Sequence, residues 1–95
     1  MTIRRDDTYL IADKLEKQKR MSLAIDAMAD NVISAIINQD KSLIRTYYNV
    51  LIGGCSIYAI ASGLDIAGLV LARNEVVTCG KRYGLEQDYI LKHLW

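Results

Sequence analysis

The feature that most constrains the fold is the absence of proline from the whole chain and of glycine before Gly53. Proline and glycine are the residues that most strongly oppose a helix, so the first half of the chain contains neither of the strong helix breakers. From Ile11 to Ile36, mostly small or apolar residues recur at alternating spacings of four and three. This heptad pattern predicts a long amphipathic helix over residues 8–37.

The length of this segment leaves two arrangements open. One unbroken helix would be about 45 Å long, whereas a compact chain of this size has a radius of gyration of about 13 Å. Either the helix breaks near residues 20–22, or it stays whole and its projecting end packs on a second copy of the chain. We expect a homodimer in both cases. The expected self-association residues are Ile11, Leu15, Ile25, Val32 and Ile36.

A second helix is expected to begin after Asp40, which can cap it together with Ser42. Gly53 and Gly54 each cost about 1 kcal/mol relative to alanine inside a helix, so the helix could end there or continue across them. The sequence Ser-Gly-Leu-Asp at residues 62–65 predicts a clearer end. There a glycine in the left-handed conformation would be followed by Asp65 as the N-cap of the next helix.

The remaining sequence predicts helices from Ile66 to about Cys79 and over residues 85–95. The second of these should bury Leu85, Tyr89, Ile90 and Leu94. No window alternates with the period of two that is typical of strands. We therefore expect one all-α domain over residues 1–95, a bundle of four to five helices.

Residues 51–72 are apolar apart from Asp65 and are long enough to raise the question of a membrane span. A charge near the middle of a span costs about 2.5 to 3.5 kcal/mol, and the glycine at position 63 would end a helix halfway across. Neither flank carries the cluster of basic residues that orients a span. Two apolar helices that meet at a corner and are covered by other helices or a second subunit are the favoured interpretation. A small membrane protein is an alternative.

The 12 basic and 11 acidic residues give a net charge of +1, and no segment is consistently basic. Because phosphate contacts supply most non-specific affinity for nucleic acids, nucleic-acid binding is not favoured. Cys55 and Cys79 both lie among apolar residues, which is typical of reduced, buried thiols inside the cell. The first residues lack the continuous apolar run of a secretory signal. We therefore expect a cytoplasmic protein.

Few residues are suited to catalysis, since His93 is the single histidine. A dyad of His93 with Cys79 would require the last helix to fold back toward residue 79, and nothing in the spacing indicates this. Metal-ligand spacings such as CxxC or HExxH are absent, and the glycines do not form a phosphate-binding loop. We expect no enzyme activity, no cofactor and no metal.

The segment TCGKRYGLEQDYILKHL resembles the core of a helix-turn-helix motif. Gly80 stands four residues before the turn residue Gly84, and Ile90 stands where a core residue of the second helix is required. The resemblance covers about twenty residues and implies DNA binding through residues 80–95 as an alternative function. However, the first residues of that helix include two carboxylates, Glu86 and Asp88, which would meet phosphates and mostly acceptor base edges. A structural helical corner is the favoured interpretation.

The aromatic residues are six tyrosines and one tryptophan, without phenylalanine. Tyrosine is enriched at protein interfaces because it combines an apolar ring with a polar hydroxyl. The leading hypothesis is a non-catalytic protein that self-associates and binds another protein as an adaptor, inhibitor or regulator. The expected partner-binding residues are Tyr47, Tyr48, Lys81, Arg82 and Tyr83.

Overall fold

Four α-helices, and no strand, make up the part of the chain that the structure describes. The structure is a computed structural model, and it describes the backbone of residues 5–94 and the side chains of residues 14–94. The helices are α1 (Arg5–Ile37), α2 (Lys41–Ala61), α3 (Gly68–Arg82) and α4 (Gln87–His93). The predicted all-α class is confirmed.

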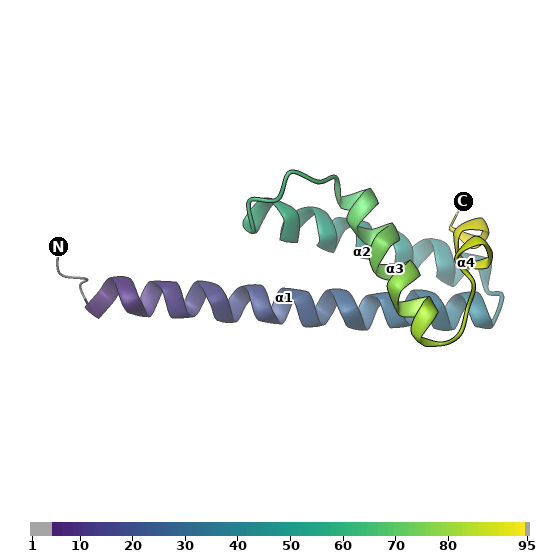
Figure 1. Ribbon diagram of the computed structural model, residues 1–95, viewed down its shortest axis with the longest axis horizontal. Helices are drawn as coiled ribbons and strands as arrows, with labels where there is room; N and C mark the ends of the chain where they lie inside the picture. The colour runs from purple at the N-terminus through teal and green to yellow at the C-terminus, as the bar shows by residue number, and fades with distance from the viewer. Residues whose placement is uncertain (1–4, 95) are drawn as a thin grey trace.

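The helices pack as an antiparallel pair crossed by a third helix (Figure 1). α2 runs back along the second half of α1, α3 lies across both, and α4 lies at the end where α1 turns into α2. The first part of α1 extends beyond α2, so the molecule measures 56 × 22 × 21 Å. Its radius of gyration is 16.2 Å, against about 13 Å for a compact chain of this size.

The backbone of α1 is helical across residues 20–22, where the sequence allowed a break. Its second half supplies most of the core, because Ala29, Val32 and Ile36 point toward α2 and α3 and are almost fully buried. The side chains before Lys14 lie outside the described residues. The amphipathic character of the first turns therefore stays a prediction.

The turn between α1 and α2 ends in the predicted cap. The carboxylate of Asp40 accepts a hydrogen bond from the backbone N–H of Leu43 at 3.1 Å, while Ser42 lies inside the helix. α2 continues across Gly53 and Gly54, because neither position has a backbone conformation that breaks a helix. Of the two outcomes that the sequence left open at this glycine pair, the structure has the continuous helix.

α2 ends at Ala61, in the predicted region, and Gly63 just beyond it has a left-handed φ of +67°. The backbone N–H of Leu64 donates to the carbonyl of Ala59 at 2.9 Å, which satisfies a carbonyl of the last turn. The prediction that Asp65 caps the next helix is wrong: α3 begins at Gly68, after Ala67, without a side-chain cap. An extended link carries the chain to Gly68, where the backbone of α3 can approach α2 closely.

The last corner is built on two glycines. Gly84 has a φ of +80° and turns the chain between α3 and α4. Gly80 lets the side chain of Ile90 pack directly on α3, where Ile90 is fully buried. Leu85, Tyr89 and Leu94 are half-buried around this contact, which agrees with the predicted buried side of the last helix.

The apolar segment 51–72 is divided between α2 and α3 by the link at residues 62–67. Among the described residues, no helix is both long enough and apolar enough to cross a membrane.

Candidate functional site

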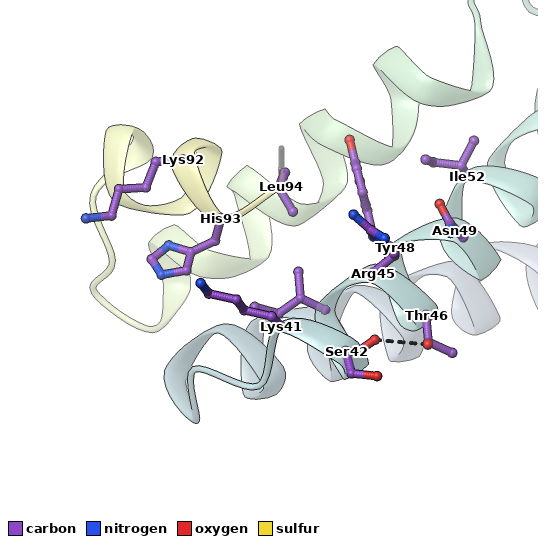
Figure 2. A pocket seen from close by; sticks show the side chains of 11 residues that line it. Lys41, Ser42, Arg45, Thr46, Tyr48, Asn49, Ile52, Lys92, His93 and Leu94 are labelled. Atoms are coloured by element: carbon purple, nitrogen blue, oxygen red, sulfur yellow. Dashed lines mark hydrogen bonds between the residues drawn. The ribbon is translucent and has the colours of Figure 1, made fainter.

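A cleft of about 910 Å³ lies between the first half of α2 and the end of α4 (Figure 2). α4 packs mainly against α3, and its contact with α2 is weaker than its contacts with α3 and α1. Its basic lining residues are Lys41 and Arg45 from α2 and Lys92 and His93 from α4. Its lining residues include no aspartate or glutamate, so the cleft is suited to an anionic group.

His93 is held in place at the end of α4. Its Nδ1 lies 2.7 Å from the carbonyl oxygen of Tyr89, and a carbonyl only accepts, so Nδ1 carries the proton and donates. The imidazole also packs against the Tyr89 ring in a tilted arrangement, with 4.6 Å between the ring centroids. Figure 2 shows the side chain of Lys41 pointing from α2 toward His93.

Tyr48 and Arg45 form the part of the cleft wall that is farther from His93. Tyr48 is buried, and burial raises the pKa of its hydroxyl; the nearby Arg73 opposes this, and Cys55 adds to it. The hydroxyl therefore remains a neutral hydrogen-bond donor at physiological pH. Hydroxyl, ammonium and guanidinium donors together are typical of a surface that binds carboxylate or phosphate groups.

A second hollow, an apolar groove of about 310 Å³, lies between α1 and α2. Every residue that lines it is apolar or glycine. Gly54 lies in this groove, and a Cβ at its position would meet no atom of the chain within 4 Å. The lining residues are Met21, Ala24, Ile25, Met28, Val50, Leu51, Gly54 and Ile57.

The residues predicted for self-association are divided between the core and the surface. Ile25, Val32 and Ile36 are buried within one chain, in a core cluster that also contains residues of α2, α3 and α4. Leu15 is 60% exposed and is free to contact a second copy. The side chain of Ile11 lies outside the described residues.

The residues predicted for partner binding also differ in exposure. Tyr48 is buried and lines the α2/α4 cleft, and Tyr47 is half-buried against the core. The other three are exposed at the end of α3 and the turn that follows. Their role in binding a partner stays a prediction. These three residues are Lys81, Arg82 and Tyr83.

The two cysteines are held as buried thiols. Burial raises the pKa of both Cys55 and Cys79 to about 11, helped by Glu75 near Cys55 and by Asp30 near Cys79. The Cys79 thiol donates a hydrogen bond to the Asp30 carboxylate at 2.7 Å. Cys79 is therefore engaged with Asp30 and His93 with Tyr89, so the structure does not pair the two as a dyad.

One helical turn before this thiol contact on both helices, Glu75 on α3 faces Asp26 on α1. Burial raises the pKa of Glu75, and the neighbouring Asp26 carboxylate raises it further by charge and by a side-chain hydrogen bond. Arg82 acts in the opposite direction. The described residues contain no group of three or more metal-ligating side chains.

Two surfaces were missed by the reasoning from sequence. The basic cleft joins residues about fifty positions apart, so no local pattern marks it. The exposed apolar face of α2 does have a signal, because Leu43, Val50 and Ile57 recur every seven residues. Comparison with protein-family models, with curated proteins and with solved structures finds no match to this chain.

Proposed function

We propose that this chain is a small non-catalytic protein that self-associates and binds another protein as an adaptor, inhibitor or regulator. The observation that carries the proposal is the amount of exposed aliphatic surface: among the described residues, nine large aliphatic side chains are 40 to 82% exposed. Three of them, Leu43, Val50 and Ile57, share one side of α2, and contiguous exposed apolar surface marks interaction sites. The nine residues are Leu15, Leu23, Ile37, Leu43, Val50, Ile57, Ile60, Leu64 and Leu69.

The chemistry of the second protein follows from the α2/α4 cleft. Lys41, Arg45 and Lys92 supply positive charge there, and no carboxylate among the lining residues neutralises it. Hydrogen bonds between such groups and carboxylates are about twice as strong as neutral ones. The proposed partner therefore presents an acidic segment to this cleft. Two buried cysteines without a disulfide suit a reducing compartment, so we place the protein in the cytoplasm.

Affinity capture with charge-reversed variants tests the partner-binding part. The double variant Lys41→Glu with Arg45→Glu alters two exposed residues and should leave the fold intact. A partner captured by the unmodified chain should be lost with this variant and retained with the control Lys19→Glu, whose side chain is exposed on α1 away from the cleft. Equal capture by all three proteins would exclude the cleft as the binding surface.

Light scattering after size-exclusion chromatography tests the self-association part. The proposal expects a mass above the 10.7 kDa of one chain. A mass of 10.7 kDa at every concentration would remove self-association from the proposed function.

DNA binding is a second candidate, and the corner between α3 and α4 favours it. The contact of Gly80 with Ile90 and the left-handed Gly84 have the arrangement that the helix-turn-helix resemblance implies. Two features oppose it: α4 has only seven residues, and Asp88 lies in its first turn. The candidate predicts salt-sensitive binding to duplex DNA that weakens when Lys81 and Arg82 are changed to glutamine. Absence of binding at low ionic strength would eliminate it.

A further inference from the structure

The side of α2 that borders the groove with α1 carries a row of apolar residues with the spacing of a coiled coil. Leu43, Val50 and Ile57 stand seven residues apart and are 40, 54 and 63% exposed. A small or aromatic residue follows each of them after four positions, which completes alternating spacings of four and three. We call this row the α2 stripe. Its members are Leu43, Tyr47, Val50, Gly54, Ile57 and Ala61.

Near its middle, this side of α2 is symmetric about the glycine pair at residues 53–54. Val50 and Ile57 each lie three and a half positions from the midpoint of that pair. Tyr47 and Ile60 are likewise equidistant from it. An antiparallel second copy of α2 centred on the glycines would therefore place Val50 against the Ile57 of that copy, and the reverse. This is the reciprocal contact that a two-fold symmetric interface requires.

The glycine pair also provides the space for such a contact. A Cβ at Gly53 or Gly54 would meet no atom within 4 Å, so the surface there is open. Beside Gly54 the groove of about 310 Å³ continues toward Met28 on α1. An aliphatic side chain from a second helix can enter this hollow, as a side chain of one helix enters the groove of another in close helix packing.

The charge pattern allows a second copy as the occupant. From Thr46 to Leu64 the sequence has no charged residue, so two copies of α2 can meet without like-charge repulsion. The same surface has no charged group that would orient a charged helix of another protein. We propose that two copies of this chain pair antiparallel along the α2 stripe, with the two-fold axis at Gly53 and Gly54. This pairing rests on the self-association in the proposed function and assigns its surface.

Matched lysine variants test the surface. Ile57→Lys places a charge on the α2 stripe, whereas Leu69→Lys places one on the exposed side of α3, and both side chains are at least 47% exposed, so neither change disturbs the core. By light scattering, the unmodified chain and Leu69→Lys should have twice the 10.7 kDa mass of one chain, and Ile57→Lys should have 10.7 kDa. If Ile57→Lys remains dimeric, this surface is wrong while self-association stands. If the unmodified chain is monomeric, or enters lipid vesicles as a monomer, both the pairing along the α2 stripe and the proposed self-association are wrong.

Cysteine cross-linking tests the direction of pairing. Under oxidation by diamide, Gly53→Cys should form a disulfide with its own counterpart, because position 53 lies next to the axis. Val50→Cys alone should not form an intermolecular disulfide, but a mixture of Val50→Cys and Ile57→Cys chains should form one. Cross-linking of Val50→Cys with itself and not with Ile57→Cys would show parallel pairing and overturn the proposal. The native Cys55 and Cys79 are fully buried, and the unmodified chain treated in the same way controls for them.

Discussion

Gly68 lies against Ser56 so closely that a Cβ at position 68 would stand 2.8 Å from the backbone nitrogen of Ser56. Cβ atoms in proteins essentially never come this near to a backbone atom of another residue. The first residue of α3 thus rests on the backbone of α2, and this contact sets where α3 begins. The requirement for glycine at position 68 comes from packing, since its backbone conformation is an ordinary one.

Gly68→Ala should lower the free energy of unfolding by about 1 to 3 kcal/mol, the usual cost of overpacking. Urea denaturation at one fixed protein concentration measures it. The matched control is Gly53→Ala in the Ile57→Lys background, which should be monomeric, so that the new Cβ meets open space. The control should be more stable than its background by up to about 1 kcal/mol, through helix propensity alone. Equal effects at the two glycines would contradict the close approach of α2 and α3.

Gly54→Leu should separate stability from self-association. In the Ile57→Lys background the leucine points into the apolar groove and should raise the free energy of unfolding by about 1 kcal/mol, because leucine is a better helix former than glycine. In the otherwise unmodified chain the same side chain should fill the hollow and reduce the mass measured by light scattering toward that of one chain. A stable dimer of Gly54→Leu would show that this hollow does not receive a second copy.

Removal of the cap on α2 should have a modest and specific cost. Asp40→Ala leaves the backbone N–H of Leu43 without its acceptor, and such changes cost about 1 kcal/mol. Asp40→Asn keeps a side-chain oxygen at the same position and should retain most of the stability. Thermal unfolding followed by circular dichroism compares the two variants with the unmodified chain. If alanine and asparagine destabilise equally, charge rather than the hydrogen bond is responsible.

The Asp26 and Glu75 contact between α1 and α3 should make stability depend on pH. Burial, and then Asp26, raise the pKa of Glu75 above its usual 4.5 in the folded chain. The folded state therefore holds the proton of Glu75 more tightly than the unfolded state does. The stability that this proton contributes is complete below pH 4.5, and it is lost as the pH rises through the raised pKa of Glu75 in the folded chain. Glu75→Gln should flatten the decline across that interval. Denaturation curves measured from pH 4 to pH 8 test this, and an unchanged decline in the variant would place its origin elsewhere.

The sequence was most informative where a local rule determines the structure. Because the first half of the chain contains neither proline nor glycine, the sequence predicts the helix that precedes Asp40. Gly63, which is left-handed in the structure, predicts the end of α2. The start of α3 could not be predicted in this way. It is set at Gly68 by a contact with Ser56, twelve positions earlier on another helix, and the attractive local cap at Asp65 is unused.

The candidate surfaces were harder to predict, because periodicity shows which side of a helix is apolar and does not show what covers it. The heptad positions Ile25, Val32 and Ile36 were assigned to a second copy, whereas the structure buries them beneath α2 and α3 of the same chain. The α2 stripe has the same period and remains exposed. The basic cleft forms because Lys41 and His93, which are far apart in the sequence, lie close together in space. No local sequence pattern predicts this.

Sedimentation equilibrium of the unmodified chain over a series of dilutions measures its average mass at each concentration and so tests self-association. Mass action requires the fraction of dimer to rise with concentration. The average mass should rise from 10.7 kDa toward twice that value, and it should stay at 10.7 kDa for Ile57→Lys over the same series. An unmodified chain of 10.7 kDa at all concentrations would contradict self-association.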